Sequence, residues 1–273
     1  MFRLISRGLR RLIELMLVII ILVLAVLGVI GRNEVDAHIE RTGPVSSSEI
    51  GDAVEVNDGS ELDGYVTSFA ADVYPDYYRV IGTTTTVREG REDGIAYGPL
   101  DDHGRATGAS GWISGAMRAE ARAKGRVRKD LPDPAGWPDE NPEVDIPGAK
   151  GRRDYHGWLW NRSHLVAASL GGEPVAENLV AGTRTQNVGD NVRPGGMAYT
   201  ETLARDWLDA HAHGRLWYAV TPIYEGDEPI PRAVIVDIAT DDGEIDQKVM
   251  VYNAANGFDI DYRTGESRSG MVF

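Results

Sequence analysis

The segment Trp158-Leu-Trp-Asn161-Arg162-Ser-His164-Leu-Val-Ala opens the part of the chain that holds most of its chemically informative side chains. Downstream, residues 177–180 are Glu-Asn-Leu-Val, residues 183–187 are Thr-Arg-Thr-Gln-Asn and residues 197–201 are Met-Ala-Tyr-Thr-Glu. A histidine is thus followed by two asparagines, an arginine and a glutamate. Such groups supply a general base, a cation for phosphate oxygens and oxygen ligands for a hard metal ion. The combination predicts metal-assisted hydrolysis of a phosphodiester.

The composition indicates a folded, acidic protein. Its 273 residues are 42% hydrophobic, which is enough to bury the core of one sizeable domain or two small ones and excludes a disordered chain. The net charge of -14 has the wrong sign for a protein that coats nucleic acid electrostatically. Residues 150–205 differ, because they hold seven Lys and Arg against five Asp and Glu. The absence of cysteine excludes disulfides and thiolate metal sites.

The N-terminus carries a membrane signal. Four arginines, at positions 3, 7, 10 and 11, precede an apolar run over residues 15–30. The run exceeds the ~7–15 residues of a signal-peptide core and sits at the lower limit for crossing a hydrocarbon layer about 30 Å thick. We expect residues 1–32 to form a cytosolic basic flank and an uncleaved signal-anchor transmembrane helix. The protein would then be a single-pass protein of the cell membrane with its C-terminal domain outside the cytoplasm, or a secreted protein if the segment is cleaved.

The rest of the chain predicts a tether and one domain. Residues 33–63 are polar and acidic and are expected to form a flexible tether to a domain over residues 64–273. Strands are predicted over 78–88, 94–100, 216–224, 233–238 and 248–252. Helices are predicted over 110–124 and 199–210, and a proline-rich extended loop over 130–148. The expected fold is α+β, with a mostly antiparallel central sheet beside the segment that starts at Trp158.

The motif Asn161-Arg162-Ser163-His164 resembles the Asp-Arg-Gly-His signature of the DNA/RNA non-specific endonucleases, a family of ββα-metal nucleases. The downstream segments follow the family's order and spacing from about residue 94 to residue 267, and bacterial DNA-entry nucleases and streptodornases are the most similar members. The resemblance implies a ββα-metal nuclease domain. Two positions depart from the signature: Asn161 replaces an Asp and removes a charge near His164, and Ser163 replaces a Gly.

The resemblance also implies roles for individual side chains. Hydrolysis at neutral pH needs a group with a pKa of about 7 to accept a proton from water, and His164 is the candidate, with a structural histidine as the alternative. Asn187 matches the family's metal-binding asparagine, and its amide oxygen suits Mg²⁺ and also Mn²⁺. Asn178 is expected to organise the catalytic site, and Glu201 to contact the water shell of the metal.

Two arginines offer planar guanidinium groups for phosphate oxygens. Arg184 is expected to bind the substrate phosphate. Arg162 either binds phosphate as well or pairs with an internal carboxylate, and both alternatives stay open at this point.

Together these features predict a membrane-anchored, extracytoplasmic, Mg²⁺-dependent endonuclease that acts on DNA, with RNA as a second candidate substrate. No base-reading module is apparent, and phosphate contacts carry no sequence information, so cleavage is expected to be non-specific. Two alternatives remain: a catalytically weak nucleic-acid-binding receptor on the same scaffold, and a structural or adhesive surface protein. The ordered His, Asn, Arg and Glu positions favour the enzyme.

Overall fold

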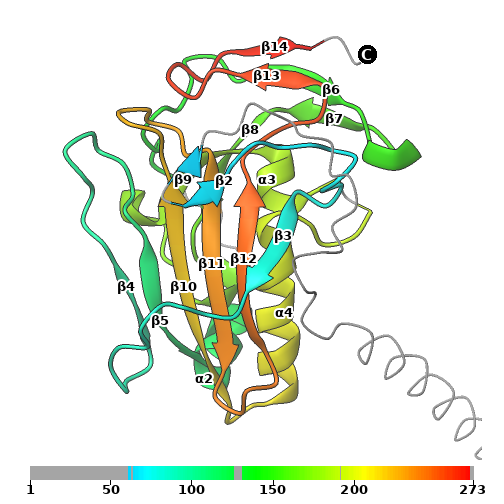
Figure 1. The fold of residues 1–273 in the computed structure, drawn as a ribbon. Helices are drawn as coiled ribbons and strands as arrows, with labels where there is room; N and C mark the ends of the chain where they lie inside the picture. The colour runs from blue at the N-terminus through cyan, green and yellow to red at the C-terminus, as the bar shows by residue number, and fades with distance from the viewer. Residues whose placement is uncertain (1–60, 63, 126–130, 191, 271–273) are drawn as a thin grey trace, which may run out of the picture. The chain divides into compact units, whose positions relative to one another are not determined.

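A six-stranded antiparallel sheet forms the centre of the fold (Figure 1). The computed structural model describes residues 61–62, 64–125, 131–190 and 192–270. The strand order is β3 (Tyr78–Gly82), β12 (Asp246–Tyr252), β11 (Ala233–Thr240), β10 (Arg215–Ile223), β5 (Ala109–Ser114) and β4 (Gly94–Tyr97). Alternate side chains of β10 and β11 enter one core cluster, as the two-residue period of a strand requires. These side chains are Leu216, Tyr218, Val220, Val234, Val236 and Ile238.

Helix α4 (Met197–Ala210) covers the core face of this sheet (Figure 1). Its buried residues are Met197, Thr200, Ala204, Trp207 and Leu208. The start of α4 requires glycine at position 196, where φ is 55° and a Cβ would lie 2.1 Å from the carbonyl oxygen of Gln186. Helix α2 (Gly115–Lys124) packs beside α4. There Arg118 donates from Nε and Nη2 to the carboxylate of Asp209, at 3.0 and 2.9 Å.

Short two-stranded sheets surround this core. They pair β1 (Glu61–Leu62) with β2 (Tyr65–Val66), β6 (Glu143–Ile146) with β7 (Tyr155–Trp158), β8 (Trp160–His164) with β9 (Leu179–Thr183), and β13 (Phe258–Ile260) with β14 (Ser267–Ser269). Helix α3 (Arg184–Val188) follows β9, and 3-10 turns cover Ala149–Gly151, Ala168–Leu170 and Ala176–Asn178. Trp160, Ile146 and Ile260 share a second core cluster, which joins β8 to β6 and β13.

The predicted α+β class and the mostly antiparallel sheet are confirmed, but the predicted helix over 110–124 is wrong in its first third. Residues 109–114 form the inner strand β5, and the helix begins at Gly115. Ile113 enters the main core, whereas Trp112 packs on the opposite face against Trp217, with ring centroids 5.6 Å apart. This alternation suits a strand, and Ser114 then caps the helix by accepting from the N–H of Met117.

Other boundaries also differ from those predicted. The strand predicted over 78–88 ends at Gly82, because Thr84 and Thr86 leave the ladder and donate hydrogen bonds to Asp246 and Asp237. The loop predicted over 130–148 contains β6. The predicted anchor over 1–32 lies outside the described residues, and so does the predicted tether apart from Glu61 and Leu62, which form β1. Among the helices of the described residues, none has the length and apolar character needed to cross a membrane.

Candidate functional site

The central segment folds as two paired strands followed by a helix. β8 and β9 are antiparallel, and His164, the last residue of β8, lies opposite Leu179. Helix α3 starts directly after β9, where Thr183 Oγ1 accepts a hydrogen bond from the N–H of Gln186 at 3.0 Å. A Cβ on Gly182 would lie 2.2 Å from Gln186 Oε1. Glycine at that position therefore lets α3 fold back closely onto the strands.

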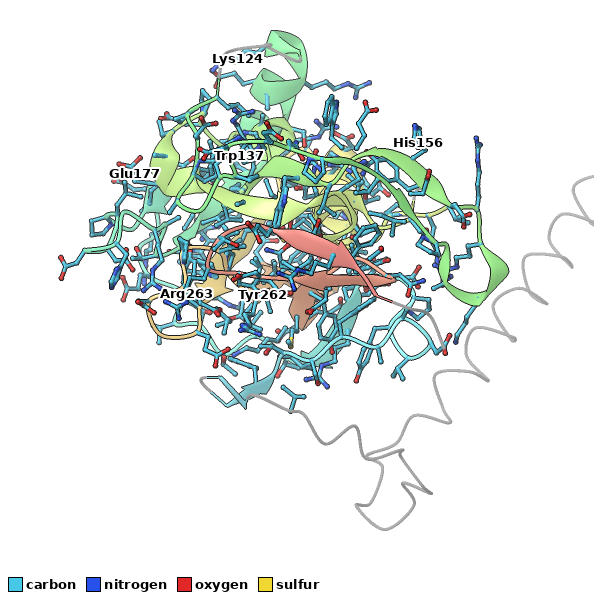
Figure 2. All side chains as sticks on the ribbon, turned by 90° about the horizontal axis from the view of Figure 1, so that it is seen from above. Lys124, Trp137, His156, Glu177, Tyr262 and Arg263 are labelled. Atoms are coloured by element: carbon cyan, nitrogen blue, oxygen red, sulfur yellow. The ribbon has the colours of Figure 1, made fainter. Side chains whose placement is uncertain are left out.

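A cleft of about 1660 Å³ runs beside this strand-strand-helix unit. Pockets for small molecules measure about 300–1,000 Å³, so this cleft has room for a segment of a polymer. Its polar lining includes Asn161, Arg162, His164, Arg184 and Asn187, and its aromatic lining includes Trp137, Tyr155, Trp158 and Trp160. Figure 2 shows two residues of the cleft lining, Lys124 at the end of α2 and Trp137.

His164, the predicted general base, lines this cleft. Burial lowers the pKa of its imidazole below the ordinary value of 6.5, because the charged form loses solvation. The ring is therefore neutral at pH 7 and retains a lone pair that can accept a proton. Within the described part of the chain, no other side chain hydrogen-bonds to this ring.

Asn187 lines the same cleft as His164 and contacts Ser163, the residue that precedes His164. The fully buried Ser163 donates from Oγ to Asn187 Oδ1 at 3.3 Å. Ser163 directly precedes His164 on β8, so this bond ties the amide of α3 to the strand that carries the histidine. The serine that replaces the signature glycine thus orients the predicted metal ligand, a role that the sequence did not reveal.

The two predicted phosphate ligands, Arg162 and Arg184, each lie against an aromatic ring of the cleft. Arg162 donates from Nε to Asp133 Oδ1 at 2.7 Å, and its guanidinium carbon lies 4.1 Å from the centroid of Trp137. Of the two alternatives for Arg162, the structure thus contains a carboxylate pair, although with an exposed aspartate. The guanidinium of Arg184 lies 5.2 Å from the Tyr155 centroid, and burial lowers its pKa without removing its charge at neutral pH.

Asn178 and Glu201 do not line the cleft. Asn178 is fully buried, and its side chain bonds to the backbone of the turn that follows His164. Glu201 lies on α4, where Arg205 Nη1 donates to its Oε2 at 3.4 Å and burial raises the pKa of its carboxyl. The predicted contact of Glu201 with the water shell of a metal stays a prediction.

Comparison with known proteins identifies the family of this fold and site. The family model for DNA/RNA non-specific endonuclease matches residues 84–242, which is more than half of the chain. The chain belongs to the DNA/RNA non-specific endonuclease family. The protein is therefore a metal-dependent endonuclease, and the enzyme class predicted from the sequence is confirmed.

Individual relatives of this endonuclease agree with the assignment. A deoxyribonuclease of Streptococcus dysgalactiae subsp. equisimilis is 30% identical over 240 residues, which cover 70% of this chain and 72% of that protein. The structure of Sda1 nuclease with bound zinc ion is 31% identical and superposes with a TM-score of 0.67 over 74% of this chain and all of the other. Magnesium-bound NucA from Streptococcus agalactiae shares the fold at 22% identity and a TM-score of 0.55, over 69% and 84% of the two chains.

Replacing Asn178 with alanine is expected to destabilise the endonuclease by about 3 kcal/mol, because each lost bond to a buried group costs about 1 kcal/mol or more. Asn178 Oδ1 accepts from the N–H of Val166 at 2.9 Å, and its Nδ2 donates to the carbonyls of Val166 and Glu173 at 3.0 and 2.8 Å. For a domain of this size the melting temperature should fall by roughly 6–12 °C. Calorimetry beside Asn256→Ala, which removes one partly buried bond to Pro147, provides the comparison. Equal melting temperatures for the two variants would contradict this role.

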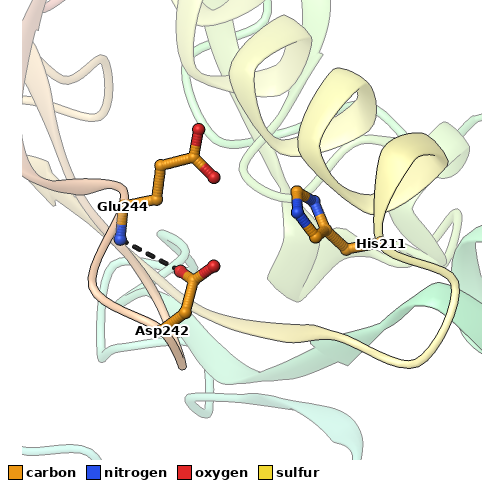
Figure 3. Close-up of side chains that lie close together, drawn as sticks. All are labelled: His211, Asp242 and Glu244. Carbon is orange, nitrogen blue, oxygen red and sulfur yellow. Dashed lines mark hydrogen bonds between the residues drawn. The ribbon is translucent and has the colours of Figure 1, made fainter.

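A second group of potential ligands lies outside the cleft. His211, Asp242 and Glu244 are exposed, and their ligand atoms lie within 4.8 Å of one another (Figure 3). His211 Nδ1 lies 2.9 Å from the carbonyl oxygen of Trp207, whose indole Nε1 donates to Glu244 Oε2 at 3.0 Å. The Asp242 carboxylate accepts from the N–H of Glu244. These bonds join the β11–β12 turn to the end of α4, which accounts for the grouping.

The structure adds residues that the sequence did not single out. Asp133 pairs with Arg162, Ser163 orients Asn187, and the rings of Trp137, Tyr155 and Trp158 line the cleft. The cluster Trp158-Leu-Trp160 beside the signature was a signal for an aromatic wall. Asp133 had none, because it lies in a proline-rich loop far from Arg162 in sequence.

Proposed function

We propose that this endonuclease hydrolyses the phosphodiester bonds of DNA, with RNA as a second substrate, without sequence preference and with Mg²⁺. The observation that carries the proposal is that His164 and Asn187 line one cleft and are linked through Ser163 Oγ, which lies 3.3 Å from Asn187 Oδ1. A base and a hard metal ligand are thereby available to one bound phosphate. The deoxyribonuclease relative supports DNA as the main substrate.

The side chains of the cleft divide the chemistry among them. Neutral His164 accepts a proton from the attacking water, which makes that water a better nucleophile. Arg184 and Arg162 offer guanidinium groups to the phosphate oxygens, and these contacts do not depend on the identity of the nucleobase. Cleavage without sequence preference follows from this arrangement.

The oxygen chemistry at Asn187 fits a hard divalent cation. Its amide oxygen suits Mg²⁺, which keeps several waters and takes few protein ligands, and Mn²⁺ accepts the same ligand type. When bound, the cation would stabilise negative charge on the phosphate and on the departing oxygen. One related structure contains zinc and another magnesium, so a titration has to compare these ions.

The test is cleavage of supercoiled plasmid, linear duplex, single-stranded DNA and RNA by the full-length protein with Mg²⁺, Mn²⁺, Zn²⁺ or EDTA. We expect nicking and then fragmentation of the plasmid with Mg²⁺, no cleavage with EDTA, and slower loss of RNA. Intact DNA with every ion at neutral and acidic pH, from protein that unfolds cooperatively, would refute the proposal.

We further propose that residues 1–32 anchor the enzyme in the cell membrane with the nuclease domain outside the cytoplasm. The support is the apolar run over residues 15–30 behind four arginines. The full-length protein should sediment with membranes after a high-salt wash, and protease added to intact cells should degrade its nuclease domain. Recovery of a shortened protein from the medium would instead identify a cleaved signal peptide.

A further inference from the structure

Trp158 exposes its indole in the cleft that His164 also lines. It is the last residue of β7, it lines the cleft together with His164, and 55% of its surface is exposed. The other large apolar residues that are exposed in the described part of the chain are five valines and a leucine, and none of them lines the cleft. An exposed indole on the wall of a binding cleft is a candidate ligand contact, since large apolar side chains on a surface often mark binding sites.

Two other aromatic rings of the cleft, those of Trp137 and Tyr155, already have an arginine guanidinium over them, whereas no described cation lies over Trp158. Arg162 lies over Trp137 and Arg184 lies over Tyr155, at 4.1 and 5.2 Å from the ring centroids. No described residue stacks on the indole of Trp158. The wall therefore presents two guanidinium groups, which suit phosphates, next to one uncovered aromatic face.

The backbone holds this indole in a defined place. Trp158 pairs with Glu143 of β6, and its carbonyl accepts a hydrogen bond from the hydroxyl of Tyr155 at 3.1 Å. The next residue, Leu159, donates its N–H to the carbonyl of Pro142 at 2.9 Å. Because the backbone is held on both sides, little main-chain freedom is lost when a ligand packs on the ring.

The charges of the cleft leave electrostatic attraction weak. Lys124 pairs with Glu120 at 2.7 Å and Arg162 pairs with Asp133, so carboxylates offset part of the positive charge of the lining. The chain as a whole carries a net charge of -14. Proteins that bind single-stranded nucleic acid combine cationic side chains, which contact the phosphate backbone, with aromatic side chains that stack on the bases. Each stacked base contributes strongly to affinity whatever its identity.

We infer that Trp158 stacks on a nucleobase of a strand bound in the cleft and that the cleft therefore favours unpaired strands; this rests on the proposed nuclease function. In a duplex each base is already stacked between its neighbours, so a base must leave the helix before it can reach Trp158. Single-stranded or locally melted nucleic acid avoids that cost. Stacking does not depend on base identity, which agrees with cleavage of any sequence.

Binding to a non-cleaving form tests the stacking directly. In full-length His164→Ala protein with Mg²⁺, Trp158→Ala and Trp158→Leu should weaken binding of a labelled single-stranded oligonucleotide by about 5- to 100-fold. Trp158→Phe should retain most of the affinity, because an aromatic face remains. The same oligonucleotide with abasic sites should bind weakly to every form. Equal affinity of the leucine and phenylalanine variants, or tight binding of the abasic strand, would overturn the inference.

Cleavage separates this inference from the proposed function. With His164 intact, the ratio of the cleavage rate for single-stranded DNA to that for duplex DNA should be greater than one. This ratio should fall in Trp158→Ala. If the wild type cuts DNA and the ratio is unchanged in Trp158→Ala, the stacking role is wrong and the nuclease function stands. If the folded wild type cuts no nucleic acid, the proposed function itself fails.

Discussion

Replacing His164 with alanine is expected to lower the turnover number for DNA cleavage by about 100- to 10,000-fold, the usual contribution of a general base. The imidazole lines the cleft, and the loss of solvation at that place keeps it neutral at pH 7. Binding should change little, because the arginines and the aromatic wall remain. The measurement is single-turnover cleavage of labelled DNA at saturating Mg²⁺.

His156→Ala is the matched control for this change. His156 lies on β7, is exposed and pairs with Asp145 at 2.7 Å, and it does not line the cleft. It should cleave at close to the wild-type rate. A His164→Ala variant that retains its melting temperature and more than about a tenth of the wild-type rate would remove His164 from the role of general base.

The acid limb of the pH profile should report the same group. Because burial lowers the pKa of His164, the cleavage rate should stay constant at neutral pH and fall as the pH decreases below 6.5, where the ring becomes protonated. Asn161→Asp restores a carboxylate in the cleft lining, and a negative charge favours the protonated ring. That variant should therefore move the acid limb to higher pH. Superimposable profiles for the two proteins would show that position 161 does not act on the histidine.

Replacing Asn187 with alanine is expected to reduce metal-dependent cleavage by at least about 100-fold at a fixed Mg²⁺ concentration, since even partners that only orient a ligand are worth about 10- to 100-fold. The variant removes the amide oxygen that lies 3.3 Å from Ser163 Oγ. The measurement is the cleavage rate as a function of Mg²⁺ and Mn²⁺, with EDTA as the metal-free reference.

Two variants make the Asn187 result specific. Asn187→Asp retains an oxygen ligand and should keep metal-dependent cleavage. Ser163→Ala leaves the ligand but removes the bond that orients it, and should raise the metal concentration needed for half-maximal rate with a smaller effect at saturation. Identical metal titrations for Asn187→Ala and wild type would place the metal ligand elsewhere in the cleft.

The candidate site residues could be predicted from the sequence, whereas the residues that contact them could not. His164, Asn187, Arg162 and Arg184 were named from short motifs, and the structure brings all four into one cleft. They share this cleft because β8, β9 and α3 follow one another in the chain. β9 pairs antiparallel with β8, and α3 begins directly after β9. The carboxylate that pairs with Arg162 belongs to Asp133, and no local rule connects those positions.

Secondary structure failed where long-range pairing overrode local preference. Residues 110–114 precede an alanine-rich helix and fit its pattern, but they form β5 because β10 pairs with it from about a hundred residues away. Ile113 and Trp112 then bury against opposite faces of the sheet.

By itself, the sequence determined the fold class, the order of the family motifs and the candidate residues for the chemistry, because these depend on neighbouring residues and on local hydrophobic patterns. Only the tertiary structure decided which strands pair in the central sheet, that Ser163 orients Asn187, and that Asn178 and Glu201 do not line the cleft. It also decided that Trp158 keeps an exposed ring while Trp160, two positions on, is buried. These outcomes depend on packing between segments far apart in the chain, which no local pattern records.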